Sequence, residues 1–107
     1  MKTYHEPKVV LKVIGDRYGV QFPIQHSSYK NAIEIRRIAS VMLIFHTSLP
    51  IRAIAEEVGY KRLKSVTEAK TWYNLEVPYD NRIKSELNKI DSIIRKIEPQ
   101  EYEIPKL

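Results

Sequence analysis

Cysteine is absent from this chain of 107 residues, and glycine occurs only three times. The absence of cysteine excludes a disulfide framework and a thiolate metal site. The chain also lacks a glycine-rich loop that could cradle a phosphate group. Its longest apolar run, Val41 to Phe45, is too short to span a bilayer. We therefore expect a cytoplasmic protein without a membrane partner, associated with the nucleoid if it binds DNA.

Residue patterns typical of catalysis are missing as well. His5, His26 and His46 are far apart in the sequence, and no pair of metal ligands recurs at helical spacing. No serine or carboxylate lies in a recognisable nucleophile motif. We expect a protein that is not an enzyme, and we infer no cofactor, no metal ion and no small-molecule ligand.

Charged and apolar residues, by contrast, are plentiful. They make up 29% and 43% of the chain, proportions typical of a globular protein. The length fits one domain. The formal net charge is +5, and the basic excess lies in the first two thirds, because residues 80–107 carry six basic and six acidic side chains. Such an excess is compatible with a polyanionic partner.

The first third of the chain predicts a β-hairpin over residues 8–23. Two segments rich in β-branched and aromatic residues flank Gly15 and Asp16, a pair that suits a two-residue turn. In that register one face is entirely apolar, and Lys12 and Arg17 lie on the other. The outer face is either a solvated edge or a basic ribbon that contacts phosphates. Because the apolar face must pack on helices, the predicted fold class is α+β.

Four helices are predicted after the hairpin, over residues of about 28–46, 49–58, 62–75 and 81–97. The first contains apolar residues at helical spacing and ends in the apolar run, a pattern typical of a central helix covered on several sides. The expected N-caps are Ser27 or Ser28, then Ser48, then Asp80 or Asn81. We expect His46 to cap the end of the first helix.

The residues around Gly59 have the pattern of two helices joined by a sharp turn. Gly59 can adopt the left-handed conformation that ends a helix, and Ala55 is small enough to let a second helix cross closely. Val66 and Ala69 follow Gly59 by seven and ten residues, and Tyr60 follows it directly. This spacing resembles the helix-turn-helix of AraC-type DNA-binding regulators.

The resemblance covers residues 48–75 and implies a DNA-binding module whose second helix lies in the major groove. Arginine, lysine, glutamate, serine and threonine side chains can all contact base edges there. The predicted base-side contacts are Arg62, Lys64, Thr67, Glu68 and Thr71. The predicted phosphate contacts are Ser48, Arg52, Lys61 and Lys70, and Ser65 belongs to the same polar face. The alternative is an ordinary solvated helix face.

The last predicted helix carries an apolar seam with heptad spacing. Its residues are Ile83, Leu87, Ile90, Ile94 and Ile97. The seam either folds back onto the core of the same chain or pairs with a second copy. We favour a homodimer interface, since proteins that recognise palindromic DNA are commonly two-fold dimers.

These patterns together favour a small dimeric transcriptional regulator that binds duplex DNA in a sequence-specific manner. Two alternatives belong to other classes. One is a protein–protein adaptor or inhibitor, in which the helix-turn-helix is only a packing solution. The other is an accessory nucleic-acid-binding subunit of a recombination or replication machine.

Overall fold

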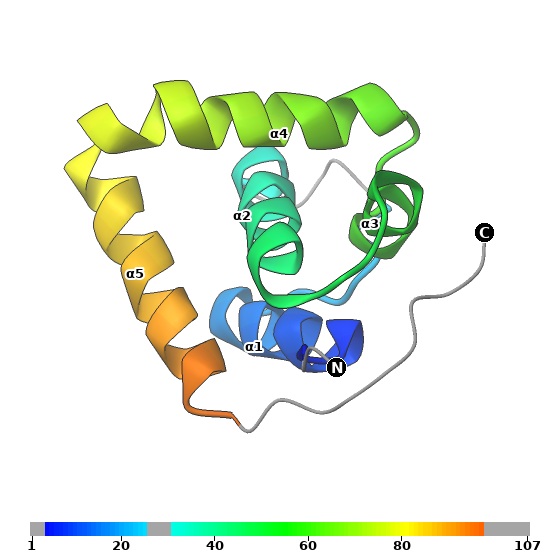
Figure 1. Cartoon of the computed structure of the whole chain (residues 1–107), viewed down its shortest axis with the longest axis horizontal. Coiled ribbons are helices and arrows are strands. Elements are labelled where there is room, and N and C mark those ends of the chain that lie inside the picture. The colour runs from blue at the N-terminus through cyan, green and yellow to red at the C-terminus, as the bar shows by residue number, and fades with distance from the viewer. Residues whose placement is uncertain (1–3, 26–30, 98–107) are drawn as a thin grey trace.

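The protein folds as a set of α-helices packed around one central helix (Figure 1). The structure is a computed structural model, and it describes residues 4–25 and 31–97. The five α-helices are α1 (Pro7–Tyr18), α2 (Ala32–His46), α3 (Ile51–Val58), α4 (Leu63–Leu75) and α5 (Asn81–Arg95). A short 3-10 helix, η1 (Val77–Tyr79), joins α4 to α5. No β-strand occurs among these residues, so the predicted α+β class is wrong.

The segment predicted as a hairpin over residues 8–23 is helix α1. Pro7 lies in its first turn, where a missing N–H costs nothing. Val10, Leu11 and Ile14 are buried on one side of it, a spacing that fits a helix as well as their β-branched character fits a strand. The chain turns after α1 at Gly19, which has the left-handed φ of 67°, and not at Gly15 and Asp16.

Gly15 lies inside α1 and is needed there for another reason. A Cβ atom at this position would lie 2.6 Å from the carbonyl oxygen of Val20, which follows the helix. The absence of a side chain therefore lets the chain fold back closely over the last turn of α1. The sequence predicted a hairpin turn at this glycine, because a glycine next to an aspartate is also typical of a tight turn.

Helix α2 lies at the centre and packs against α1, α3, α4 and α5, as its apolar run predicts (Figure 1). Ile38, Met42 and Leu43 are almost completely buried. The helix begins at Ala32, after the left-handed Asn31, and not at residue 28. Ser27 and Ser28, the predicted caps, lie outside the described residues.

The predicted turn between α3 and α4 is confirmed. Gly59 ends α3 with φ of 102°, and its N–H donates to the carbonyl oxygen of Ala55 at 3.0 Å. Ala55 itself is buried between the helices. The N-cap position of α3 is occupied by Pro50 and not by Ser48, the residue predicted for it. Helix α3 therefore begins two residues later than expected.

Helix α5 begins where the sequence predicts and ends two residues earlier. The Asp80 carboxylate accepts hydrogen bonds from the backbone N–H groups of Arg82 and Ile83, so the predicted cap is confirmed. On the side facing α1, Glu86 accepts hydrogen bonds from Arg17 Nε at 2.7 Å, from Arg17 Nη2 at 2.9 Å and from the Tyr18 hydroxyl at 2.5 Å. These bonds fasten the end of α1 to α5.

The hydrogen bonds from Arg17 and Tyr18 form a clamp on Glu86, and this clamp makes the free energy of unfolding depend on pH. The hydrogen bonds from Arg17 and Tyr18, together with the positive charge of Arg17, outweigh burial and lower the pKa of Glu86 to about 2. The free energy of unfolding therefore gains a contribution that is present above the unfolded pKa near 4.5 and is lost as the pH falls towards 2.

Replacing Glu86 by glutamine is expected to lower the free energy of unfolding at pH 7 by about 1–2 kcal/mol, allowing for partial solvent screening. The matched control is Asp16→Asn, which breaks the exposed ion pair between Lys12 and Asp16. We expect it to change the free energy of unfolding by less than about 0.5 kcal/mol. Urea unfolding at pH 7 and near pH 3 measures both. Equal losses for the two variants, or a Glu86→Gln loss that does not shrink in acid, would contradict the clamp.

Candidate nucleic-acid interface

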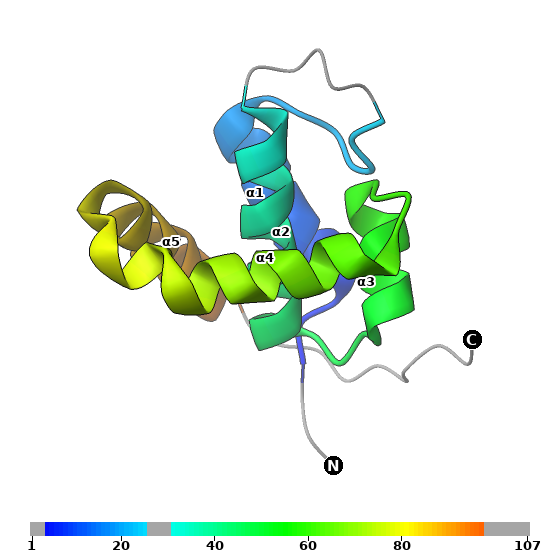
Figure 2. The same cartoon turned by 90° about the horizontal axis from the view of Figure 1, so that it is seen from above.

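Helix α4 lies on the outside of the molecule, across α2 and α3, with no other helix in front of it (Figure 2). Val66, Ala69 and Trp72 are buried on its inner side, and their spacing of three residues sets the rotation of the helix. Leu63 is 45% exposed and Tyr73 is half-buried, so neither belongs fully to this inner side. The opposite side of α4 is therefore open along its whole length.

The N-terminal end of α4 is positively charged and has no side-chain cap. Arg62 is the N-cap residue, and its side chain accepts no hydrogen bond. The first turn has no acidic residue, while Lys61, Arg62 and Lys64 are exposed around it. Free backbone N–H groups and the helix dipole already favour an anion at such an end. Adding three cations there weakens the helix and strengthens the site for an anion.

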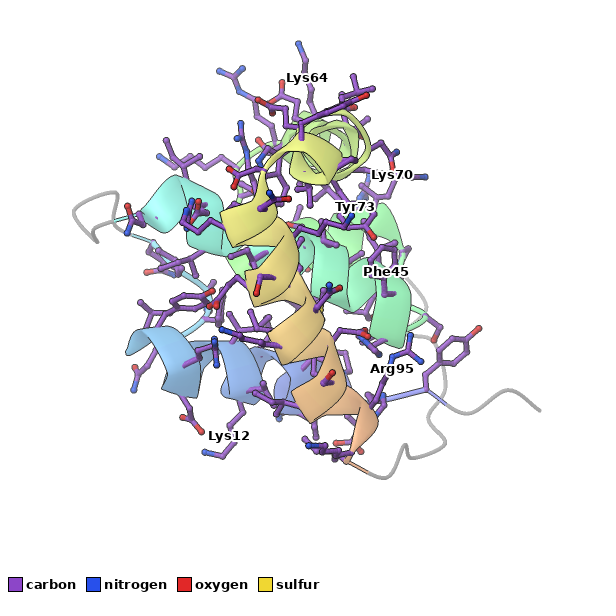
Figure 3. All side chains as sticks on the ribbon, turned by 90° about the vertical axis from the view of Figure 1, so that its left-hand side faces the viewer. Lys12, Phe45, Lys64, Lys70, Tyr73 and Arg95 are labelled. Atoms are coloured by element: carbon purple, nitrogen blue, oxygen red, sulfur yellow. The ribbon has the colours of Figure 1, made fainter. Side chains whose placement is uncertain are left out.

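The predicted contact residues fall into two groups. Eight of them are exposed on α4, on the turn before it or on α3, and the described ion pairs involve none of their basic side chains. They are Arg52, Lys61, Arg62, Lys64, Thr67, Glu68, Lys70 and Thr71. Figure 3 shows Lys64 pointing outward from α4. Ser48 and Ser65 are half-buried, so they are less exposed than the other eight residues.

Two contacts involve side chains of α4. The Thr71 hydroxyl donates to the carbonyl oxygen of Thr67 at 3.1 Å, which leaves only its lone pairs for a ligand. The guanidinium of Arg37 lies 5.8 Å from the centre of the Trp72 ring, a cation–π distance. Trp72 is only 8% exposed and packs in the core. Arg37 of α2 is therefore tied to α4.

The apolar seam of α5 is buried in the chain's own core. Ile83, Leu87, Ile90 and Ile94 are 4% exposed or less, and Ile97 is half-buried. They pack with the other buried residues of the helical core, so of the two interpretations of the seam the structure has the intramolecular one. A dimer through these residues would require α5 to leave the core. Homodimerisation itself stays a prediction, without this surface to support it.

A groove of about 600 Å³ lies between the ends of α2 and α4, η1 and α5. The rings of Phe45 and Tyr73 pack edge to face beside this groove, with their centroids 5.0 Å apart (Figure 3). On its α5 side, Asp91 accepts hydrogen bonds from His46 Nε2 at 2.6 Å and from Arg95 Nε at 2.7 Å. His46 therefore bonds to a side chain of α5. It does not cap α2, although the sequence predicted that it would.

Burial is the main cause that lowers the pKa of His46, against the opposite effect of Asp91. At neutral pH the ring is therefore neutral and donates its N–H to the carboxylate. The bond between His46 and Asp91 therefore ties α2 to α5 at the edge of the groove.

Within residues 4–25 and 31–97, no three His, Cys, Asp or Glu side chains come together as a candidate metal site. None of the described helices combines the length and apolarity that crossing a membrane requires. No protein-family model, no curated protein and no solved structure matches the chain. The α4 surface must therefore be interpreted from its own geometry and charge.

Proposed function

We propose that the protein binds duplex DNA through the exposed face of α4 and acts as a small transcriptional regulator. The observation that carries this proposal is the uncapped, basic N-terminal end of α4 projecting from a helix–turn–helix whose turn is held by Gly59. An α-helix of 13 residues is about 20 Å long and fits the major groove, which is about 12 Å wide.

Base and phosphate contacts would come from different parts of this surface. Arg62 and Lys64, at the free end of α4, can donate to guanine, and Glu68 can accept from cytosine. Lys61 and Lys70 flank them, so they are suited to hold the phosphates on either side. Occupancy of a promoter by the bound protein would then block or recruit polymerase without any small-molecule effector.

The experiment that tests this function is a titration of the purified protein into labelled duplexes across a salt series. One duplex carries the DNA upstream of its own coding sequence, and the other has random sequence. We expect log K to fall linearly with log salt for both duplexes, and tighter binding to the upstream DNA by a factor of about 10³ or more. Equal affinity for both would favour a general accessory binder. Absence of binding at low salt would exclude both functions and favour an adaptor.

A further inference from the structure

The acidic side chains of α5 are partly buried and paired, whereas its lysines are exposed. Both acidic residues within it make ion pairs with other side chains, Glu86 with Arg17 of α1, and Asp91 with His46 of α2 and with Arg95. Neither is fully exposed. The balanced charge of residues 80–107 therefore conceals a helix whose remaining surface is basic.

The outer side of α5 forms a shallow hollow of about 650 Å³ with no acidic residue in its lining. Lys84, Lys89 and Lys96 line it, with Ser85, Asn88 and Ser92 between them. All six are exposed, and the described ion pairs involve none of the three lysines. Lysine, serine and asparagine are side chains that donate hydrogen bonds to phosphate oxygens.

The length of α5 over which these lysines are spread is comparable to a stretch of nucleic-acid backbone. Lys84 and Lys96 are twelve residues apart, which is about 18 Å along a helix. One strand of duplex DNA carries about five phosphates over that axial distance, one every 3.4 Å. A second hollow, on α1, serves as a contrast, because its lysines Lys8 and Lys12 share it with Asp16 and Glu57. Of these two hollows, the one on α5 has charges of a single sign in its lining.

We propose that the outer face of α5, centred on Lys89 and Lys96, is a second surface that binds the sugar–phosphate backbone of nucleic acid. It extends the proposed function of α4, because it adds a contact without base readout on a different helix. Figure 1 shows α4 and α5 along two different sides of the molecule, joined at a corner through η1. The protein therefore contacts two separate backbone segments, either of one bent duplex or of two duplexes.

The test compares two double variants that remove the same charge. Lys89→Ala with Lys96→Ala changes the α5 face, and Lys8→Ala with Lys12→Ala changes α1. All four lysines are exposed, so both variants should keep the fold, which a thermal melt checks. Affinity for random duplex is measured across a salt series. We expect the α5 variant to reduce the salt slope by about 2, since each neutralised phosphate contributes about 0.9, and the α1 variant to leave it unchanged.

Equal changes in the two variants, or none in either, would overturn the α5 surface. The variant Arg62→Ala with Lys64→Ala, measured in parallel, separates the two proposals. If it binds as tightly as the wild type while the α5 variant loses slope, the α4 function fails and the α5 surface stands. The reverse pattern overturns the α5 surface alone. Binding of the wild type to vesicles of anionic phospholipid, with no binding to duplex, would also overturn it.

Discussion

Replacing Gly59 by alanine is expected to lower the free energy of unfolding by about 4 kcal/mol or more, the range of the most damaging substitutions. Two costs add at this position. The left-handed φ of 102° costs a residue with a side chain about 1–2 kcal/mol. The new Cβ atom would also lie 2.3 Å from the carbonyl oxygen of Ile24 and 2.8 Å from its backbone nitrogen.

The clash at Gly59 cannot be relieved by a change of rotamer, because the atoms it meets belong to the backbone. The Ile24 N–H donates to the carbonyl oxygen of Val58 at 3.1 Å, and its side chain is completely buried. Moving Ile24 away would break this hydrogen bond and open the core. The same contact holds the turn between α3 and α4 in place, so the substitution should also disturb the orientation of α4.

The matched control for Gly59→Ala is Gly19→Ala. Gly19 also has a positive φ, 67°, but a Cβ atom there would have no neighbour within 4 Å. We expect this control to cost only the conformational penalty of about 1–2 kcal/mol. Urea unfolding followed by circular dichroism measures both variants, and failure of Gly59→Ala alone to accumulate as folded protein counts as the larger loss. Similar losses in the two variants would refute the role of the Ile24 contact.

The helices after residue 31 could be predicted from the sequence because their apolar residues keep a helical spacing. Val66 and Ala69 are buried on one side of α4, as predicted, and Asp80 has the side chain that a helix cap requires. The segment before residue 24 was misread because valine and isoleucine favour strands when considered alone. In α1 their burial against α2 outweighs that preference.

The exposed face of α4 was predictable, and the long-range contacts were not. Periodicity alone predicts which polar side chains of an amphipathic helix face solvent. By contrast, Arg17 and Glu86 are 69 residues apart, and no local pattern links them. Only once that contact and the pairing of Asp91 with His46 are known does the basic face of α5 become visible. The net charge of a segment does not reveal this face, because paired acidic side chains and unpaired basic side chains cancel in the sum.

The central claim is that α4 binds duplex DNA, and the substitution of Arg62 and Lys64 together by alanine bears on it most directly. Both residues are exposed at the free end of α4, so their removal should not affect folding. A good bidentate contact to a base contributes about 1–3 kcal/mol. Loss of two such contacts should weaken binding to the upstream duplex by about 10²-fold or more, since each 1.4 kcal/mol is tenfold.

The control for this pair is Lys8→Ala with Lys12→Ala. Lys12 lies at the end of the molecule opposite Lys64 (Figure 3). The measurement is the affinity of wild type and both variants for the upstream duplex, by fluorescence anisotropy at one fixed salt concentration. We predict a loss of about 10²-fold for the α4 variant and less than about threefold for the control. Wild-type affinity in the α4 variant, or the same loss in both, would contradict the account.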